Sequence, residues 1–179
     1  MRLSLYEFRT GAEILGGHRV VYDVANDTAA YGESHVEGPA LVWQLDDTPE
    51  EADGALLSRR IQIDPFGEWV IRCDRIDFPP GGVAYRHTHP GPGIRYLLFG
   101  SLLIDPHGHA YGPGEAWFEG AGDPVLATAS ETEDTAFVRV LLLPREWEGK
   151  RTISYLDPAD EEKPKLQRAT VFLEAPVES

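Results

Sequence analysis

The fold is decided by residues 81–100, which read GGVAYRHTHPGPGIRYLLFG. His87 and His89 flank one threonine, and a Pro/Gly turn then leads into an apolar run that opens with Ile94 and Arg95. Successive side chains of a strand point to opposite faces, so the two histidines share a face, with Cα atoms about 6–7 Å apart. Two imidazoles on one wall begin a site for iron, zinc, manganese, nickel or copper; the alternative is a pair of solvated histidines.

The order of these features resembles the first motif of the cupin superfamily, which here runs from Gly81 through the His-x-His pair to Gly100. A downstream stretch at 113–125, PGEAWFEGAGDPV, resembles the second cupin motif. The two stretches cover residues 81 to about 129, little more than a quarter of the chain. The resemblance implies an all-β fold, the cupin-type double-stranded β-helix, which is a jelly-roll barrel with N- and C-terminal extensions.

The composition sets limits on the class of protein. A chain of 179 residues suits one domain with extensions, and 42% hydrophobic with 26% charged residues is typical of a soluble globular protein. Thirty acidic against 16 basic residues give a formal charge of -14, which argues against a nucleic-acid surface. The single cysteine excludes an intrachain disulfide. Neither a signal peptide nor a membrane-spanning apolar run is evident, so we expect a cytoplasmic protein.

Short apolar runs separated by 18 glycines and 14 prolines predict a β-sandwich or barrel. Helix is limited to two short capped turns, at 48–51 and 157–162. Strands are expected at 19–24, 40–45, 55–63, 69–78, 83–89, 95–104, 116–119, 124–129, 137–143, 152–155 and 169–173.

Three parts follow from this pattern: an N-terminal extension (1–55), a barrel core (56–145) and a C-terminal arm (146–179). The extensions carry spare strands, and such strands cover a sheet edge or pair with a partner subunit. A homodimer and a chain whose arms fold back on its own barrel are equally compatible with the sequence.

The resemblance also implies a ligand set. Cupin metal sites usually take two histidines and a glutamate from the first motif and a third histidine from the second. His87 and His89 match the first pair, but the glutamate slot falls at Gly93 and the third histidine slot at Val125. Glu119, at the end of a predicted strand, would complete a two-histidine, one-carboxylate set for a divalent metal ion. The alternative for Glu119 is a carboxylate at the protein surface.

Arg95 is a candidate substrate-binding residue because strand alternation places it on the face that the missing glutamate would use. A buried arginine needs an anionic partner, and both Glu119 and an anionic substrate group qualify. Tyr85 and Trp117 are candidates for the walls of a pocket, with core packing as the alternative. Arg139 is a second polar residue within an apolar strand, facing either the barrel interior or solvent.

The resemblance implies a protein that binds a divalent metal through the His-x-His pair and acts on a small anionic molecule inside the barrel. Oxygenase, isomerase and lyase chemistry all occur among cupins, and no catalytic residue is assigned. The alternative is a metal-free cupin that binds or senses a small molecule. A second His-x-His pair, His107 and His109, is expected on an exposed hairpin. The sequence contains no nucleophile elbow, P-loop or dinucleotide fingerprint.

Overall fold

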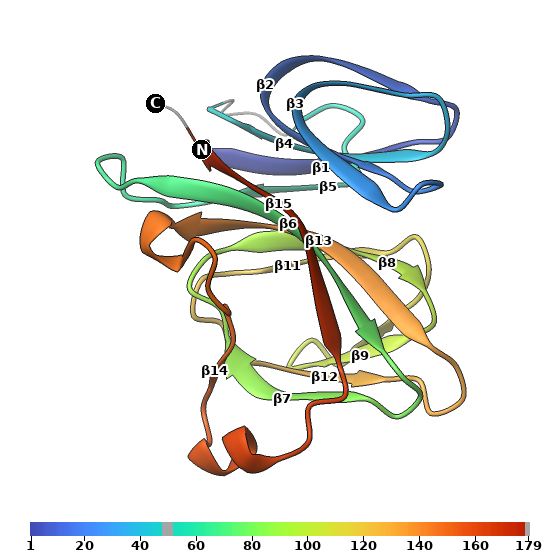
Figure 1. The fold of residues 1–179 in the computed structure, drawn as a ribbon, viewed down its shortest axis with the longest axis vertical. Coiled ribbons are helices and arrows are strands. Elements are labelled where there is room, and N and C mark those ends of the chain that lie inside the picture. The colour runs from blue at the N-terminus through green and yellow to red at the C-terminus, as the bar shows by residue number, and fades with distance from the viewer. Residues whose placement is uncertain (48–51, 178–179) are drawn as a thin grey trace.

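Three five-stranded antiparallel sheets form the described part of the chain in a computed structural model, which covers residues 1–47 and 52–177 (Figure 1). The N-terminal sheet has the order β3-β2-β4-β1-β5. Its strands are β1 (Arg2–Phe8), β2 (Ala12–Asp23), β3 (Thr28–Val36), β4 (Ala40–Asp46) and β5 (Leu57–Arg60).

The other two sheets face each other and enclose the barrel. The covered sheet, on which the N-terminal sheet packs, has the order β11-β8-β13-β6-β15, and the facing sheet has the order β10-β9-β12-β7-β14. The covered sheet consists of β6 (Trp69–Phe78), β8 (Gly93–Phe99), β11 (Ala116–Glu119), β13 (Thr135–Pro144) and β15 (Arg168–Val177). The facing sheet consists of β7 (Val83–Thr88), β9 (Leu102–Asp105), β10 (His109–Tyr111), β12 (Val125–Ala129) and β14 (Ser154–Tyr155).

The eight strands β6 to β13 have the connectivity of a jelly roll. Four of them, β6, β8, β11 and β13, lie in the covered sheet, and β7, β9, β10 and β12 lie in the facing sheet. Two sheets wrapped in this order leave few open edges, which is how this architecture protects its strands. The expected all-β jelly-roll barrel is confirmed.

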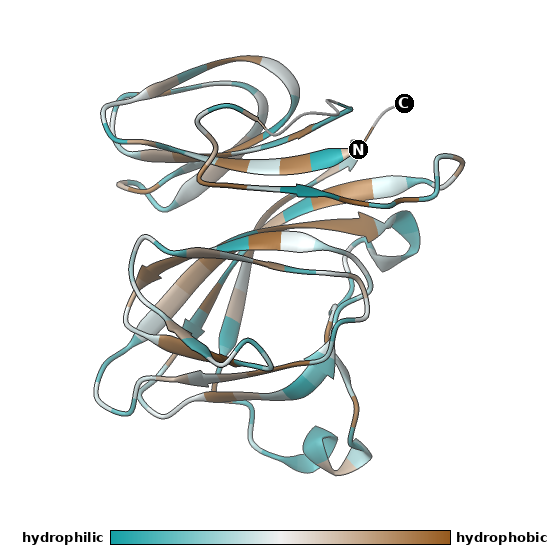
Figure 2. Cartoon of the chain, turned by 180° about the vertical axis from the view of Figure 1, so that it is seen from behind, coloured by the Kyte–Doolittle hydropathy of each residue, from teal (hydrophilic) through white to brown (hydrophobic). Residues whose placement is uncertain are grey.

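Strand alternation gives the covered sheet two buried faces. On β13, Phe137 and Arg139 line the barrel interior, whereas Val138 and Val140 pack against the N-terminal sheet. Trp43 of β4 is fully buried in that outer core, and its Nε1 donates to the backbone oxygen of Ile94, 3.1 Å away. Figure 2 shows the matching alternation of apolar and polar residues along the strand that begins at the N-terminus.

Several predicted strands need correction. The strands β6 and β11 coincide with their predicted ranges, but 95–104 is two strands, because the chain turns at Gly100 with φ of 79°. A Cβ at Gly100 would lie 2.5 Å from the backbone oxygen of Asp134, so a side chain does not fit there. The strands β1, β3 and β10 were not predicted at all.

The two short helices are 3₁₀ turns, η1 (Arg145–Trp147) and η2 (Pro158–Glu162). The turn expected at 157–162 is η2, in which the Asp157 side chain accepts a hydrogen bond from the backbone nitrogen of Ala159. The turn expected at 48–51 lies outside the described residues. No helix in the described ranges is both long enough and apolar enough to cross a membrane.

The C-terminal arm folds back on its own barrel. The strand β14 pairs with β7 and β15 pairs with β6, so the arm extends both barrel sheets of the same chain. In Figure 1 the arm runs down one side of the barrel and returns along the other side of the opening. The segment between these strands therefore borders the barrel interior. Homodimerisation stays a prediction.

Candidate functional site

A cavity of about 510 Å³ lies between the two barrel sheets and the C-terminal arm. One wall is apolar and the other carries charged and imidazole side chains, the mixture that is common in small-molecule sites. The apolar wall includes Ile76, Phe78, Ile104, Trp117, Val125 and Phe137. The polar wall includes Asp74, His87, His89, Arg95, Glu119 and Arg139.

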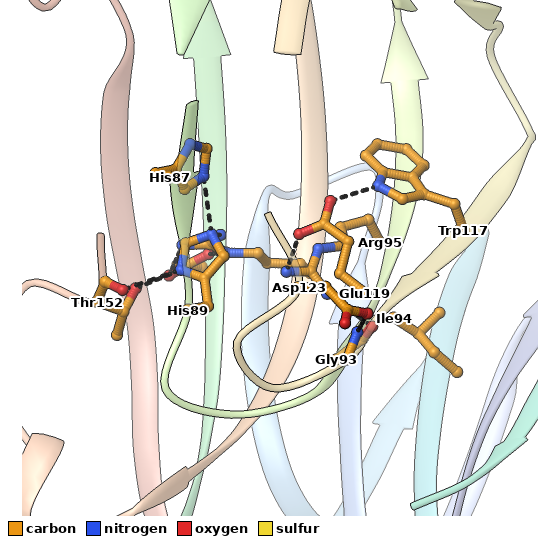
Figure 3. Close-up of polar contacts among 12 residues, drawn as sticks. His87, His89, Gly93, Ile94, Arg95, Trp117, Glu119, Asp123 and Thr152 are labelled. Atoms are coloured by element: carbon orange, nitrogen blue, oxygen red, sulfur yellow. Dashed lines mark hydrogen bonds and ion pairs between the residues drawn. The ribbon is translucent and has the colours of Figure 1, made fainter. Parts of the chain in front are cut away.

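The two histidines predicted as a pair converge in this cavity. Figure 3 shows their rings pointing toward each other, with the Nε2 atoms 3.2 Å apart. His87 Nδ1 lies 2.6 Å from the backbone oxygen of Tyr85, and His89 Nδ1 lies 3.1 Å from the backbone oxygen of Thr152. A carbonyl oxygen only accepts, so each Nδ1 carries a hydrogen and donates it. In a neutral ring this leaves Nε2 as the acceptor.

Arg139 fixes the protonation of His89 from the other side. Its Nη1 lies 3.0 Å from His89 Nε2, and a guanidinium group has donors only. His89 Nε2 therefore accepts from Arg139. Asp74 holds the guanidinium through two hydrogen bonds, 2.5 Å to Nε and 3.1 Å to Nη2. This bidentate geometry orients Arg139 toward the histidine.

Both histidines are neutral near pH 7. Burial lowers the pKa of His87, and it lowers the pKa of His89 much further. The positive charges of Arg139 and Arg95 also lower the pKa of both rings, whereas the hydrogen bond to Tyr85 and the charge of Glu119 partly raise the pKa of His87. Neutral His87 consequently presents its Nε2 lone pair toward the lone pair of His89. Two facing lone pairs repel each other, so a ligand group that donates a hydrogen to His87 Nε2 is favoured at this point.

Arg95 and Glu119 form an ion pair inside the barrel. Arg95 Nη2 lies 2.6 Å from Glu119 Oε2, while Trp117 Nε1 donates to Glu119 Oε1 at 2.8 Å (Figure 3). Arg95 Nη1 donates to the backbone oxygen of Gly93 at 2.7 Å, and Nε has no hydrogen-bond partner among the described residues. Burial lowers the pKa of the guanidinium to about 10, so it stays charged. Of the two partners that the sequence left open for Arg95, the structure contains Glu119.

Cross-strand register brings these groups together. Arg139 of β13 lies opposite Asp74 on β6 and opposite Arg95 on β8, and Arg95 in turn lies opposite Trp117 on β11. Three arginines on this sheet face the interior, each beside a carboxylate: Arg139 with Asp74 (2.5 Å), Arg95 with Glu119 (2.6 Å) and Arg72 with Glu174 (2.6 Å). Pairing offsets the large cost of burying each charge.

A metal ion, implied by the resemblance to cupins, lacks a complete donor set here. In residues 1–47 and 52–177, no group of three or more His, Cys, Asp or Glu side chains could hold a metal ion. The carboxylate of Glu119 is engaged by Arg95 and Trp117. At Gly93, the slot of the usual glutamate, a Cβ would collide with the backbone oxygen of Val140. A glutamate at this position is therefore excluded by the backbone itself.

The other positions of the usual cupin ligand set do not replace the missing glutamate as a metal ligand. Val125, in the slot of the usual third histidine, is an apolar wall residue. Arg139 uses the His89 lone pair that a metal would need. The three residues predicted as metal ligands, His87, His89 and Glu119, share one cavity, but the two imidazoles point at each other and Glu119 points at Arg95.

Of Trp117 and Tyr85, the two residues expected at the walls of a pocket, one lines the cavity. Trp117 lines the cavity, where its ring packs edge-on against Phe137 at 5.3 Å. Tyr85 does not line the cavity, and its ring lies under the ammonium group of Lys163 at 4.7 Å. The reason is a bulge in the pairing of β7 with β12, which shifts the register between Val125 and Ala127. His107 and His109 are exposed, as expected.

Sequence reasoning missed several residues of the site. Asp74, Thr152 and Gln167 line the cavity from β6 and from the C-terminal arm. Asp74 carried little signal, because the predicted strand 69–78 also contains Arg72, Arg75 and Asp77. Thr152 and Gln167 carried no signal, because only the folded arm places them beside the histidines.

No protein-family model and no curated protein sequence matches the chain. Similar solved structures include the polyketide cyclase RemF from Streptomyces resistomycificus, with 22% identity and a TM-score of 0.39 over 52% of this chain and 64% of that one. An RmlC-like cupin from Shewanella frigidimarina has 14% identity and a TM-score of 0.38 over 49% and 94% of the two chains. A cupin domain from Bordetella pertussis has 22% identity and a TM-score of 0.36 over 46% and 88%.

In these three likenesses every identity is below 25% and every TM-score is below 0.5, so no property of those proteins is assigned to this chain. This chain spans 64% of the length of RemF, and the matches cover about half of this chain. The jelly-roll barrel that residues 81–129 led us to expect rests on the strand order of the two barrel sheets.

Proposed function

We propose that the barrel binds a small organic molecule with an acidic hydroxyl group, such as a phenol, an enol or a carboxylic acid. The observation that carries this proposal is the neutral His87 imidazole, whose Nε2 lone pair meets the lone pair of His89 rather than a donor, in a cavity of about 510 Å³ with one apolar wall. This volume is within the range of small-molecule pockets. The apolar body of the ligand packs against Trp117 and Phe137.

The acidic group of the ligand meets His87 Nε2. The ligand hydroxyl donates its hydrogen to this nitrogen, and the ligand oxygen gains negative charge as the proton moves toward the imidazole. The positive charges of Arg139 and Arg95 favour that negative charge, while the Glu119 carboxylate opposes it at His87. Thr152 and Arg139 hold His89 in place and keep its ring neutral. The arrangement is that of a binding site with a general base.

This function is the metal-free one of the two that the sequence left open. The two arginines supply fixed positive charge beside the histidines, and each is oriented by its own carboxylate. A fixed charge in a site that excludes water stabilises an anion without reorganisation. We therefore expect a ligand that binds in its neutral form and ionises in the site. The alternative, recruitment of a ligand that is already anionic, would need an arginine that is not already paired with a carboxylate.

The test uses 4-nitrophenol, whose absorbance changes when its hydroxyl ionises, and 4-nitroanisole, which has the same size class but no acidic hydrogen. We expect the wild type to bind 4-nitrophenol and to increase its ionised fraction at slightly acidic pH. His87→Gln should lose the change in ionisation, whereas the exposed control His107→Gln should keep it. Equal binding of both probes, or a His87→Gln variant that still ionises 4-nitrophenol as the wild type does, would refute the proposal.

A further inference from the structure

Gln167 presents an unused hydrogen-bond acceptor to the same cavity. Gln167 follows η2, at the point where the C-terminal arm turns into β15, and its side chain lines the cavity together with His87. Its Oε1 is buried and has no hydrogen-bond partner among the described residues. Buried polar atoms nearly always have a partner, so an orphan at a cavity wall points to a ligand group.

The orientation of the Gln167 amide is fixed by Tyr155. Burial raises the pKa of Tyr155, while hydrogen bonds from Arg151 and Gln167 oppose that rise, as donors do. Arg151 Nη2 lies 3.0 Å from the Tyr155 hydroxyl oxygen. The amide nitrogen of Gln167 is thus the donor to Tyr155, and the amide oxygen remains as the free acceptor.

Tyr155 also places this acceptor close to the histidine pair. The rings of Tyr155 and His87 are in edge contact, with centroids 6.3 Å apart. Tyr155 Cα is paired with His87 Cα between β14 and β7. A ligand whose acidic hydroxyl meets His87 therefore lies in the same cavity as the Gln167 side chain.

We infer that Gln167 determines specificity, by selecting ligands that carry a second hydrogen-bond donor, a hydroxyl group, in addition to the acidic one. This inference rests on the proposed function and narrows the ligand class to dihydroxy compounds and hydroxy acids. An unpaired acceptor in a buried site penalises a ligand that lacks the donor. One neutral hydrogen bond accounts for about a tenfold difference in affinity.

The experiment compares 4-nitrophenol with three relatives that add one hydroxyl at different positions: 4-nitrocatechol, 4-nitroresorcinol and 2-(hydroxymethyl)-4-nitrophenol. Dissociation constants are measured by calorimetry for the wild type, Gln167→Met, Gln167→Glu and the control Thr170→Met, which alters an exposed residue of β15. We expect at least one dihydroxy probe to bind the wild type about tenfold more tightly than 4-nitrophenol. Gln167→Met should lose that preference, so that it binds the dihydroxy probe and 4-nitrophenol with similar affinity.

Gln167→Glu keeps an oxygen acceptor at the same place and should keep the preference, as should Thr170→Met. A wild type without any preference, or a preference that survives in Gln167→Met, overturns the role of Gln167 but leaves the proposed function intact if 4-nitrophenol still binds through His87. Failure of all four probes to bind overturns both.

Discussion

His89 illustrates how neighbouring groups determine the state of a titratable residue. Thr152 accepts from its Nδ1, Arg139 donates to its Nε2, and only 4% of the residue is exposed. A second proton on this ring would have to displace Arg139. The ring is therefore kept neutral by geometry as well as by burial.

A first prediction concerns the pH dependence of stability. Burial lowers the pKa of His87 and His89 below their ordinary value of 6.5, so the unfolded chain binds more protons than the folded chain as pH falls. This contribution to stability is fully present above pH 6.5 and is lost as pH falls below it. Urea unfolding at a series of pH values should show the loss, and His89→Gln should reduce it. The same dependence in His89→Gln would contradict this assignment, and the exposed control His109→Gln should behave as the wild type.

A second prediction concerns the buried pair of Arg139 and Asp74. Arg139→Met leaves the Asp74 carboxylate buried without its partner and should cost about 3–5 kcal/mol of the free energy of unfolding. The double variant Arg139→Met/Asp74→Leu should cost less than the sum of the two single variants, because no lone charge remains. Additive losses in a double-mutant cycle measured by urea unfolding would mean that the two side chains are not coupled.

At this scale the sequence predicted the members of the site better than their contacts. Strand alternation and the cupin-like spacing were sufficient to place His87, His89, Arg95, Trp117 and Glu119 around one cavity. They were insufficient to predict that the Glu119 carboxylate pairs with Arg95 rather than with a metal ion. That pairing depends on the register of β11, β8 and β13 relative to one another. The bulge in β7 that turns Tyr85 away from the cavity cannot be recognised from the order of apolar and polar residues in the sequence.

At the scale of elements, the contact between β8 and β13 depends on one glycine. A Cβ at Gly93 would collide with the backbone oxygen of Val140 and lie 2.6 Å from Leu141 Cδ2. The same glycine presents its own carbonyl to Arg95. Close approach of the two strands is therefore part of the geometry of the site.

A third prediction follows for Gly93→Ala, which should lower the free energy of unfolding by about 1–3 kcal/mol because the strands must move apart. The matched control is Gly38→Ala, where a Cβ would meet Ala25 Cβ at an ordinary 3.7 Å. Thermal unfolding of both variants is the measurement. A Gly93→Ala variant as stable as Gly38→Ala would show that β8 and β13 have room for a side chain.

Prediction of the elements succeeded where apolar alternation was regular and failed where it was not. The strands β6 and β11 were predicted with their exact bounds, since each is a clear β-rich run between turn residues. The strand β3 (Thr28–Val36) was missed because it is largely exposed and polar. The arm strand β14 has two residues and is defined by its pairing with β7.

At the scale of the whole molecule, the N-terminal sheet and the barrel share one apolar core. Leu3, Leu5 and Trp43 from that sheet pack with Ile71 and Val138 from the covered sheet. Both faces of the covered sheet are buried. If the N-terminal sheet detached, one face would be exposed to water and the stabilisation from its buried apolar area would be lost. The N-terminal sheet is thus an integral part of the folded unit.

A fourth prediction is that the two parts unfold together. Trp43→Ala should lower the free energy of unfolding by about 3–5 kcal/mol, because the side chain is fully buried. The urea transitions of wild type and variant, followed by circular dichroism and by tryptophan fluorescence, should coincide. Two separate transitions, with only the first shifted by Trp43→Ala, would mean that the sheet and the barrel are independent.

The central claim is that Arg139 and Arg95, rather than a metal ion, supply the positive charge beside His87 and His89. The most direct measurement is elemental analysis of tag-free protein after incubation with iron, zinc, manganese, nickel or copper salts and removal of free ions, with His87→Ala in parallel. We predict no stoichiometric metal in either protein. Near-stoichiometric metal in the wild type that is lost in His87→Ala would contradict the claim and restore the metal site that the sequence motif predicted.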